Sequence, residues 1–233
     1  MNARWSWLAT ALLVGSLSAP VDGAPFTPFL DRTSFLGALG TVVLDDYSSA
    51  GYQLGDVVDA ALDDFHSDVH MSAVVGETDY VTTGWENLNI ITQQDIDPYY
   101  CAGCNGSFLL DFGSTSVGSP FGVFGVGFDY FNHAGFYSAL VTFGDGSTSL
   151  LSLIASSPDD WKFLGITSPV LIQSIHVSHD LLPTIDGSFG LDNLTLGGPA
   201  PAALVPEPAT FALLATSLVP VVLSSRRKRK SRS

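Results

Sequence analysis

Apolar and polar residues alternate along much of the middle of the chain, between residues 24 and 197. The clearest case runs from Tyr137 to Phe143, where Tyr, Ala, Val and Phe occupy every second position. A period of two places the apolar side chains on one face of a β-strand and the others on the opposite face. Gly144-Asp145-Gly146 follows directly and leads into another apolar run, which predicts a β-hairpin.

Short apolar runs separated by Gly, Asn, Asp and Pro recur through this whole segment. No strand–helix–strand rhythm is visible, which argues against a parallel sheet. Several strands joined by Gly-rich turns predict an all-β fold, an antiparallel two-sheet β-sandwich. The closing stretch 189–197 resembles the last strand of lectin-like jelly rolls, and this resemblance implies a jelly-roll-like sandwich. The predicted strands are Val42–Tyr47, Val81–Thr92, Phe108–Phe112, Phe121–Phe131, Tyr137–Phe143, Leu150–Ile154, Val170–Val177 and Phe189–Leu196.

Helical signals are few within this sandwich domain, which we assign to residues 24–197. Asp31 can cap a short helix in which Phe35, Leu36 and Leu39 share one face before Gly40. Residues 53–71 are ambiguous, because flanking Gly and β-branched residues leave strands open there. The four apolar residues with helical spacing in that segment are Val58, Leu62, Phe65 and Val69.

Residues 1–23 have the layout of a secretory signal peptide. Arg4 supplies a positive start, and Leu8–Leu17 is an apolar core too short to span a bilayer as a mature helix. Cleavage after Gly23 fits best, because the other small-residue positions would place a proline beside the scissile bond. A retained N-terminal anchor is the alternative.

The C-terminal part has a different composition. A linker, 198–204, precedes Val205-Pro206-Glu207-Pro208, and the apolar run 209–225 is long enough for a short transmembrane helix, with Pro220 predicted to kink it. A basic cluster ends the chain and predicts that this end lies in the cytoplasm and the domain outside. The cluster comprises Arg226, Arg227, Lys228, Arg229 and Lys230.

This three-part tail, 205–233, resembles the PEP-CTERM sorting signal of Gram-negative bacteria that make exopolysaccharide. The four-residue motif, the apolar helix and the basic cluster match in order and spacing. The resemblance implies transient anchoring in the inner membrane, cleavage near Pro206-Glu207-Pro208 by an exosortase, and delivery to the cell surface or extracellular matrix. Signal peptidase and exosortase are then partners during export. A plain C-terminal membrane anchor is the alternative.

Charge is distributed unevenly between these parts. The whole chain has 9 Lys+Arg against 23 Asp+Glu, but between residues 24 and 205 only Arg32 and Lys162 oppose 21 acids, a net charge of −19. Phosphate recognition needs a basic face, so we exclude nucleic acid as a partner and disfavour anionic ligands. A hydrophobic content of 46% also excludes wholesale disorder.

Cys101 and Cys104 are the only cysteines. Export would place them in an oxidising compartment, and a β-turn brings residues three apart close enough for a disulfide. A redox pair would open a helix, whereas Asn105-Gly106-Ser107 and a predicted strand follow here. We expect a structural disulfide; a redox role and half of a metal site are the alternatives.

Aspartate supplies 19 of the 21 acids of the middle segment. Turn chemistry and a soluble surface explain most of them, and a structural calcium site is the sharper hypothesis. Asp192 is the first candidate ligand, because the apolar residues change phase around Asp192-Asn193, which predicts a β-bulge. The stretch 189–197 resembles the last strand of lectin-like jelly rolls and carbohydrate-binding modules, and that resemblance implies calcium beside this aspartate. Asp46 and Asp129 are the possible partners.

Nucleophile, zinc-protease and phosphate-loop motifs are absent from the sequence, so we expect no enzyme. Aromatic faces can stack on neutral sugar rings. The function expected is therefore non-catalytic binding of extracellular polysaccharide, with a structural matrix protein and a secreted glycan hydrolase or lyase as alternatives. The candidate stacking residues are Trp85, Tyr99, Tyr100, Tyr130 and Trp161.

Overall fold

The computed structural model describes residues 25–52, 57–58, 65–83, 87–94, 97–102, 107–133, 135, 137–179 and 189–201. The chain divides into two units, 1–199 and 200–233, and the second is described only at Ala200 and Pro201. The predicted signal peptide, sorting motif, transmembrane run and basic cluster lie outside the described residues. Within the described part of the chain, no helix has the length and apolar character needed to cross a bilayer.

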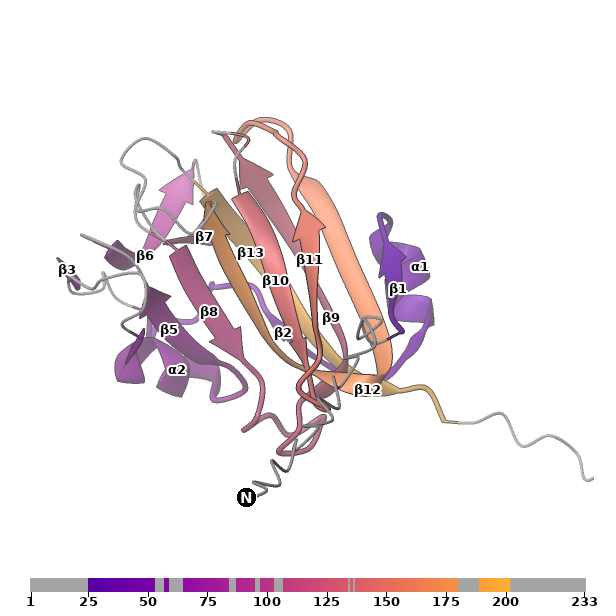
Figure 1. The fold of residues 1–233 in the computed structure, drawn as a ribbon. Coiled ribbons are helices and arrows are strands. Elements are labelled where there is room, and N and C mark those ends of the chain that lie inside the picture. Colours follow the sequence, from indigo (N-terminus) through magenta and orange to yellow (C-terminus); the bar gives the residue numbers. More distant parts are fainter. Residues whose placement is uncertain are drawn as a thin grey trace, which may run out of the picture. The chain divides into compact units, whose positions relative to one another are not determined.

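The first unit is an antiparallel β-sandwich, as the sequence predicts (Figure 1). One layer, which we call the β10 sheet, has the strand order β11-β10-β12-β8-β5-β4. Its strands other than β12 are β4 (Phe65–Ser67), β5 (Asp79–Thr83), β8 (Ser107–Asp111), β10 (Tyr137–Phe143) and β11 (Thr148–Ser152).

The other layer, which we call the β9 sheet, lies behind it in Figure 1. Here β13 lies between β9 and a second neighbour, which is β7 along its first half and β2 along its second. The strands of this layer other than β12 are β1 (Thr27–Phe29), β2 (Leu39–Asp45), β3 (Val57–Val58), β6 (Asn87–Gln94), β7 (Asp97–Ala102), β9 (Val123–Asn132) and β13 (Phe189–Pro199).

Strand β12 (Lys162–His179) belongs to both layers. Its first half pairs with β9 and β1, and its second half pairs with β10 and β8. Between the halves, Pro169 cannot donate to a ladder and Leu171 has a left-handed φ of 65°. The strand therefore turns from one sheet into the other and closes one side of the sandwich.

The hydrophobic core fills the space between the two sheets, and the alternation in β10 shows how. Tyr137, Ala139, Val141 and Phe143 are buried, while the residues between them are partly exposed. The predicted hairpin is confirmed, because Phe143 N donates to Ser147 O at 2.9 Å and β10 pairs with β11. The facing core residues come from β8, β9, β12 and β13: Phe108, Leu110, Val126, Phe128, Ile175, Val177, Leu191, Leu194 and Leu196.

One predicted strand is wrong, and the ambiguous segment 53–71 contains both strand and helix. The predicted strand 81–92 is two strands, β5 and β6, which pair with different neighbours. The helical spacing in 53–71 does not form one helix, because Phe65 lies in β4 and the helix begins only after Asp68. That residue caps helix α2 (Val69–Val75) by accepting from Met71 N, and Gly76 ends the helix with a φ of 77°.

The predicted first helix is confirmed as α1 (Arg32–Gly37), although Leu39 already belongs to β2. Asp31 caps it, accepting from Ser34 N at 2.8 Å. Phe35 is fully buried against a patch of the β9 sheet made of glycines. A Cβ added at Gly127 or Gly165 would lie within 2.7 Å of the Phe35 ring, so the helix can sit on the sheet only because these side chains are missing.

A buried carboxylate at the end of β2 organises a group of tyrosines. Asp45 accepts hydrogen bonds from the hydroxyls of Tyr52 and Tyr80, the latter at 2.9 Å, and from the backbone N–H of Tyr47. Tyr47 has a left-handed φ of 55° and stacks on Tyr100. Burial raises the pKa of Asp45, and the hydrogen bonds from Tyr52, Tyr47 and Tyr80 offset only part of that rise.

We predict that Asp45 favours folding more strongly in acid than at neutral pH. Because its pKa is higher in the folded than in the unfolded protein, its contribution is complete below the unfolded value of 3.8 and is lost as pH rises through the folded value. The quantity to compare is the free energy of unfolding of the native protein minus that of Asp45→Asn. This difference should increase by on the order of 1 kcal/mol as the pH is lowered from 7 to 4. Urea titrations at both pH values measure it.

Asp46→Asn is the matched control. Hydrogen bonds from Ser48 lower the pKa of Asp46, so its contribution is lost on acidification and the sign is opposite. A pH-independent difference between native protein and Asp45→Asn, or the same sign for both variants, would contradict this account.

Candidate functional site

Strand β13 carries the bulge that the phase change of its apolar residues predicts. The register against β9 shifts between Asp192 and Thr195, and Asn193 has a left-handed φ of 52°. Asparagine adopts this conformation more readily than most residues because its short polar side chain bonds locally. The bulge turns the side chains of Asp192 and Asn193 toward the neighbouring strand, where they meet Asp129.

Two carboxylates oppose each other directly at this bulge. Asp129 on β9 is the cross-strand partner of Asp192 on β13, an arrangement that destabilises a sheet when nothing compensates the like charges. The Asn193 side-chain amide donates to both, to Asp129 Oδ2 and to Asp192 Oδ2 at 3.0 Å each. Asn193 N also donates to Asp192 Oδ1 at 2.6 Å, so one residue bridges both acids.

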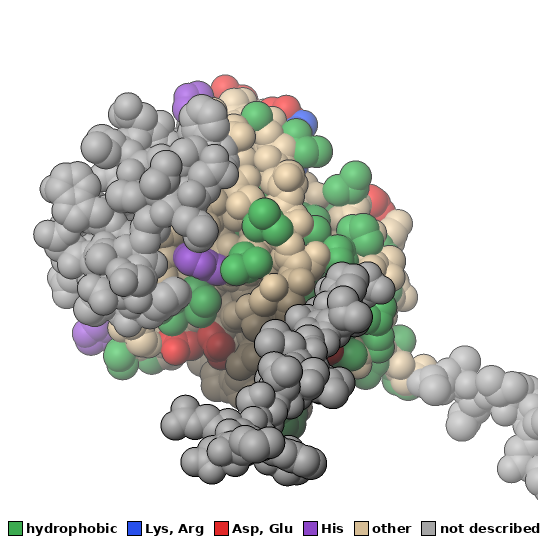
Figure 2. All heavy atoms as spheres, viewed as in Figure 1, with side chains coloured by type: hydrophobic (Ala, Val, Ile, Leu, Met, Phe, Trp, Pro, Cys, Tyr) green, Lys and Arg blue, Asp and Glu red, His purple; other side chains and the backbone are tan. Residues whose placement is uncertain are grey.

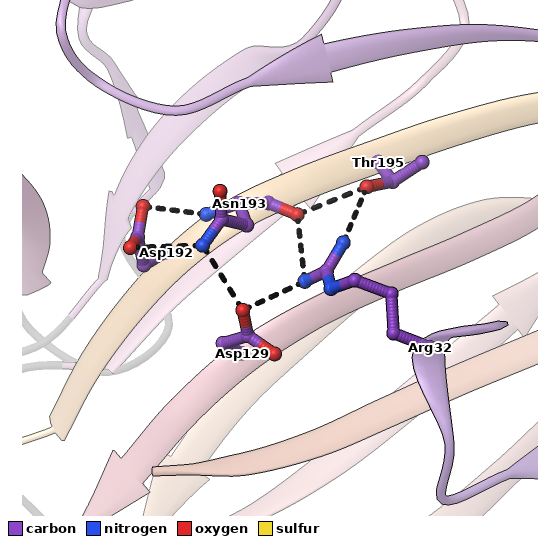
Figure 3. A network of polar contacts seen from close by, with 5 residues as sticks. All are labelled: Arg32, Asp129, Asp192, Asn193 and Thr195. Atoms are coloured by element: carbon purple, nitrogen blue, oxygen red, sulfur yellow. Dashed lines mark hydrogen bonds and ion pairs between the residues drawn. The ribbon is translucent and has the colours of Figure 1, made fainter. Parts of the chain in front are cut away.

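Arg32 completes the compensation from helix α1 (Figure 3). Its Nη2 lies 2.9 Å from Asp129 Oδ2, its Nη1 donates to Thr195 Oγ1 at 3.0 Å, and its Nη2 also donates to Asn193 O. The guanidinium carbon lies 4.7 Å from the centre of the Phe163 ring, a cation–π contact. The side chains of Arg32 and Asp129 keep 29% and 25% of their surface exposed, so solvent or a ligand can reach the pair.

The candidate calcium ligands are Asp192, Asp46 and Asp129, and calcium binding there stays a prediction. Asp129 and Asp192 lie opposite each other. Asp46 follows Asp45, the β2 residue that pairs with Leu194, and it accepts hydrogen bonds from the backbone and hydroxyl of Ser48. The positive charge that faces Asp129 is the Arg32 guanidinium. Across the residues that the structure describes, no three His, Cys, Asp or Glu side chains form a group that could hold a metal ion.

Three aromatic rings lie on the same outer face of the β9 sheet. Phe131 is two residues beyond Asp129 on β9 and therefore points to the same side. Its ring meets Trp161 edge-to-face at 4.9 Å, and Tyr99 meets Phe131 and Trp161 at 5.5 and 5.3 Å between ring centres. Trp161 is only partly buried, so this cluster presents one aromatic side chain to solvent beside the Asp129–Arg32 pair.

Two of the other candidate stacking residues do not lie in this aromatic cluster. Tyr100 is fully buried, Tyr130 is 3% exposed, and both pack in the core between the sheets, so neither ring can stack on a sugar. The Tyr130 hydroxyl accepts from Ile154 N at 3.1 Å. Trp85 and Cys104 lie outside the described residues. Cys101 lies in β7 but its side chain is outside the described part, so the predicted disulfide stays a prediction.

A histidine–hydroxyl contact in the β10 sheet is buried. His176 Nε2 lies 2.9 Å from Thr83 Oγ1, which donates to Ser107 Oγ at 2.7 Å. His176 is 9% exposed and Thr83 fully buried, and burial lowers the pKa of His176. This arrangement holds three strands together and offers no hydroxyl to a substrate.

Sequence reasoning missed Arg32, Asn193 and Phe131 as members of the site. The signal for Arg32 was present, since it is one of two cations between residues 24 and 205 and stands at the start of a capped helix. The phase change already marked Asn193. Phe131 is distinguished only by its strand partner Gly190, where an added Cβ would lie 2.1 Å from the Phe131 ring.

Comparisons with known proteins reveal no match among protein-family models and none among curated proteins. Solved structures give weak likenesses. A variant of the family 29 carbohydrate-binding module CBM29-2 shares 18% identity over 67% of this chain and 99% of its own, with a TM-score of 0.36. The K2 cleaved adhesin domain of Lys-gingipain shares 12% over 67% and 99%, also at 0.36. TM-scores this low carry no argument about function.

We predict that Asn193 holds the bulge by two separable contributions. Asn193→Ala removes the bridging amide. It also leaves in the left-handed region a residue whose side chain makes no local hydrogen bond. The variant should therefore lower the free energy of unfolding by about 1–3 kcal/mol. Asn193→Gly loses the amide but relieves the backbone, so its loss should be smaller. Denaturant unfolding at neutral pH measures both. A glycine variant less stable than the alanine variant would contradict the backbone part.

Proposed function

We propose that the protein is an exported cell-surface or matrix protein that binds neutral polysaccharide without cleaving it. The observation that carries the proposal is the placement of Trp161, Tyr99, Asp129 and Asp192 on one outer face of the β9 sheet. These four residues are far apart in sequence and were singled out separately. The fold brings them together beside Arg32.

The chemistry of this face suits a sugar ring. A pyranose offers an apolar C–H face and a rim of hydroxyls, so its binding site needs an aromatic surface beside planar polar groups. Trp161 supplies the aromatic surface, and its orientation is fixed by edge-to-face contacts with Phe131 and Tyr99. Asp129 Oδ1 accepts no hydrogen bond from another described residue, so it can accept one from a ligand hydroxyl.

Charge favours a neutral glycan over an anionic one. Arg32 and Lys162 are the only cations between residues 24 and 205, and each is paired with a carboxylate, Asp129 or Asp160. The segment has a net charge of −19, whose field repels polyanions. A neutral polymer meets no such barrier.

Export and sorting belong to the same proposal and are supported by the sequence alone. Signal peptidase would remove 1–23, and an exosortase would cleave near Pro206-Glu207-Pro208 after the run 209–225 has anchored the chain. The basic residues that follow would hold that end in the cytoplasm until cleavage. The product would keep the sandwich and lose both basic ends.

Affinity electrophoresis tests the glycan proposal. Full-length protein in mild detergent is run through gels that contain a neutral polymer (a β-glucan, an α-glucan or a galactomannan) and through a gel that contains an anionic polyuronate. We expect at least one neutral polymer to retard the native chain, and Trp161→Ala to weaken binding roughly tenfold, which corresponds to 1.4 kcal/mol. Phe121→Ala is the control, since Phe121 is an aromatic residue 64% exposed elsewhere.

The proposal fails if no polymer retards the native chain, or if Phe121→Ala weakens binding as much as Trp161→Ala does. Release of reducing ends from a retarding polymer would instead support the hydrolase or lyase alternative. Retardation by an anionic polymer alone would contradict the charge argument.

Intact-mass analysis tests the sorting proposal. The chain is expressed in a host that carries an exosortase and in the same host without it. We expect a product that ends near Pro206-Glu207-Pro208 only in the first host, and Glu207→Ala should prevent its formation. An unprocessed C-terminus in both hosts would favour the plain membrane anchor.

A further inference from the structure

Strand β11 forms an unpaired edge of the β10 sheet. Among the described residues it pairs only with β10, so its other side presents a row of backbone N–H and C=O groups. Leu150 is 66% exposed on this strand, and Ile154 just beyond it is 58% exposed. Such an edge is a template for pairing with another strand unless charges, proline or a bulge protect it.

The usual protections are missing from this edge. Residues 146–158 contain no charged side chain, and Pro158 lies well beyond the end of β11. Other edges differ: β1 contains Pro28, β4 is three residues long, and β2 ends at Asp45 and carries a register shift. In a segment with net charge −19, an uncharged edge is the place where two copies can approach with least repulsion.

The ladder with β10 fixes which backbone groups point outward. Phe143 N donates to Ser147 O, and Leu153 N donates to Tyr137 O. Antiparallel ladders alternate, so every second residue from 147 to 153 bonds to β10. The N–H and C=O groups of Thr148, Leu150 and Ser152 therefore face the open side.

Side chains on the outer face of the sheet form rows across the strands, and these rows would align with the same rows of a second copy. Leu150 pairs with Leu140, which pairs with His176, so an aliphatic row reaches the edge at Leu150. A polar row reaches the edge on either side of it. Thr142 pairs with Thr148 in one row, and Ser138 pairs with Ser152 in the other. Rotation by half a turn about Leu150 places leucine against leucine and threonine against serine.

We propose that two copies of the chain associate by antiparallel pairing of β11 with β11, about a two-fold axis at Leu150. Leu150 then faces Leu150 of the second copy, and Thr148 faces its Ser152. All three outward-facing residues of each strand are used, with about six backbone hydrogen bonds. The pairing does not depend on the proposed glycan binding, and it continues each aliphatic and polar row into the second copy.

Cysteine cross-linking of the full-length chain in mild detergent tests the pairing and its register. Opposed residues in a hydrogen-bonded pair have Cα atoms about 5.5 Å apart, within disulfide reach. Leu150→Cys should therefore form a covalent dimer under oxidation, severalfold above the native chain, which supplies the background from Cys101 and Cys104. Thr148→Cys alone should not, because its two copies lie about 13 Å apart along the strand.

A mixture of Thr148→Cys and Ser152→Cys chains should cross-link, because these positions face each other. No dimer from Leu150→Cys above background would overturn the proposal. Equal cross-linking by Thr148→Cys alone would also overturn it, because that result indicates contact without a defined register.

A charge variant tests the association without introduced cysteines. Leu150→Lys places an ammonium at the centre of the pairing and should convert dimer to monomer in sedimentation velocity. Leu44→Lys is the matched control, since Leu44 is 52% exposed on β2, at another edge. Dimers that survive Leu150→Lys, or that dissociate only with Leu44→Lys, would overturn the proposal.

Discussion

The sandwich depends on the passage of β12 from one sheet to the other. One continuous strand pairs with β9 and then with β10, so the two layers are joined by hydrogen bonds as well as by their shared core. The turn needs a residue that does not donate and a left-handed backbone, supplied by Pro169 and Leu171. Trp161 stands just before the first half and His176 lies in the second, so this strand also positions the aromatic cluster and the enclosed histidine.

The β9 sheet carries a second constraint, the direct opposition of Asp129 and Asp192. A neutral and a cationic donor compensate the repulsion between these carboxylates. The Asn193 amide approaches from the bulge, and the Arg32 guanidinium approaches from α1 (Figure 3). The helix is held in reach of this pair by Phe35 on its glycine patch. Packing and electrostatics therefore depend on each other here, because the packing of the Phe35 ring determines where the Arg32 guanidinium lies.

The outer face of the β10 sheet has a different character. Figure 2 shows this side of the molecule, where backbone and uncharged polar side chains, both tan, surround separate hydrophobic side chains in green. Its rows of serine, threonine and leucine follow from strand register alone and involve no ion pair between the described residues of β10 and β11. The two faces of the sandwich thus present distinct chemistry, a compensated polar site on one and neutral rows on the other.

Local patterns predicted the β10–β11 hairpin, helix α1 and the bulge at Asp192-Asn193, because each depends on residues close together in sequence. They did not predict that 81–92 divides between two strands, since apolar runs alone do not mark the change of partner. Nor could they separate core tyrosines from surface ones: Tyr99 and Tyr100 are neighbours, and strand alternation sends one to the outer face and the other inward. Arg32 and Asp129 are 97 positions apart, and only the fold reveals their contact.

The scarcity of cations has a consequence for resistance to proteolysis. A protease that cleaves after lysine or arginine finds two target bonds between residues 24 and 205. One follows Arg32, the first residue of α1, and the other follows Lys162, the first residue of β12. Both side chains are held by carboxylates, at Asp129 and Asp160, and both backbones belong to regular structure. Proteolysis acts mainly on the locally opened chain, so cleavage at these two bonds should depend on the opening of α1 or of the start of β12.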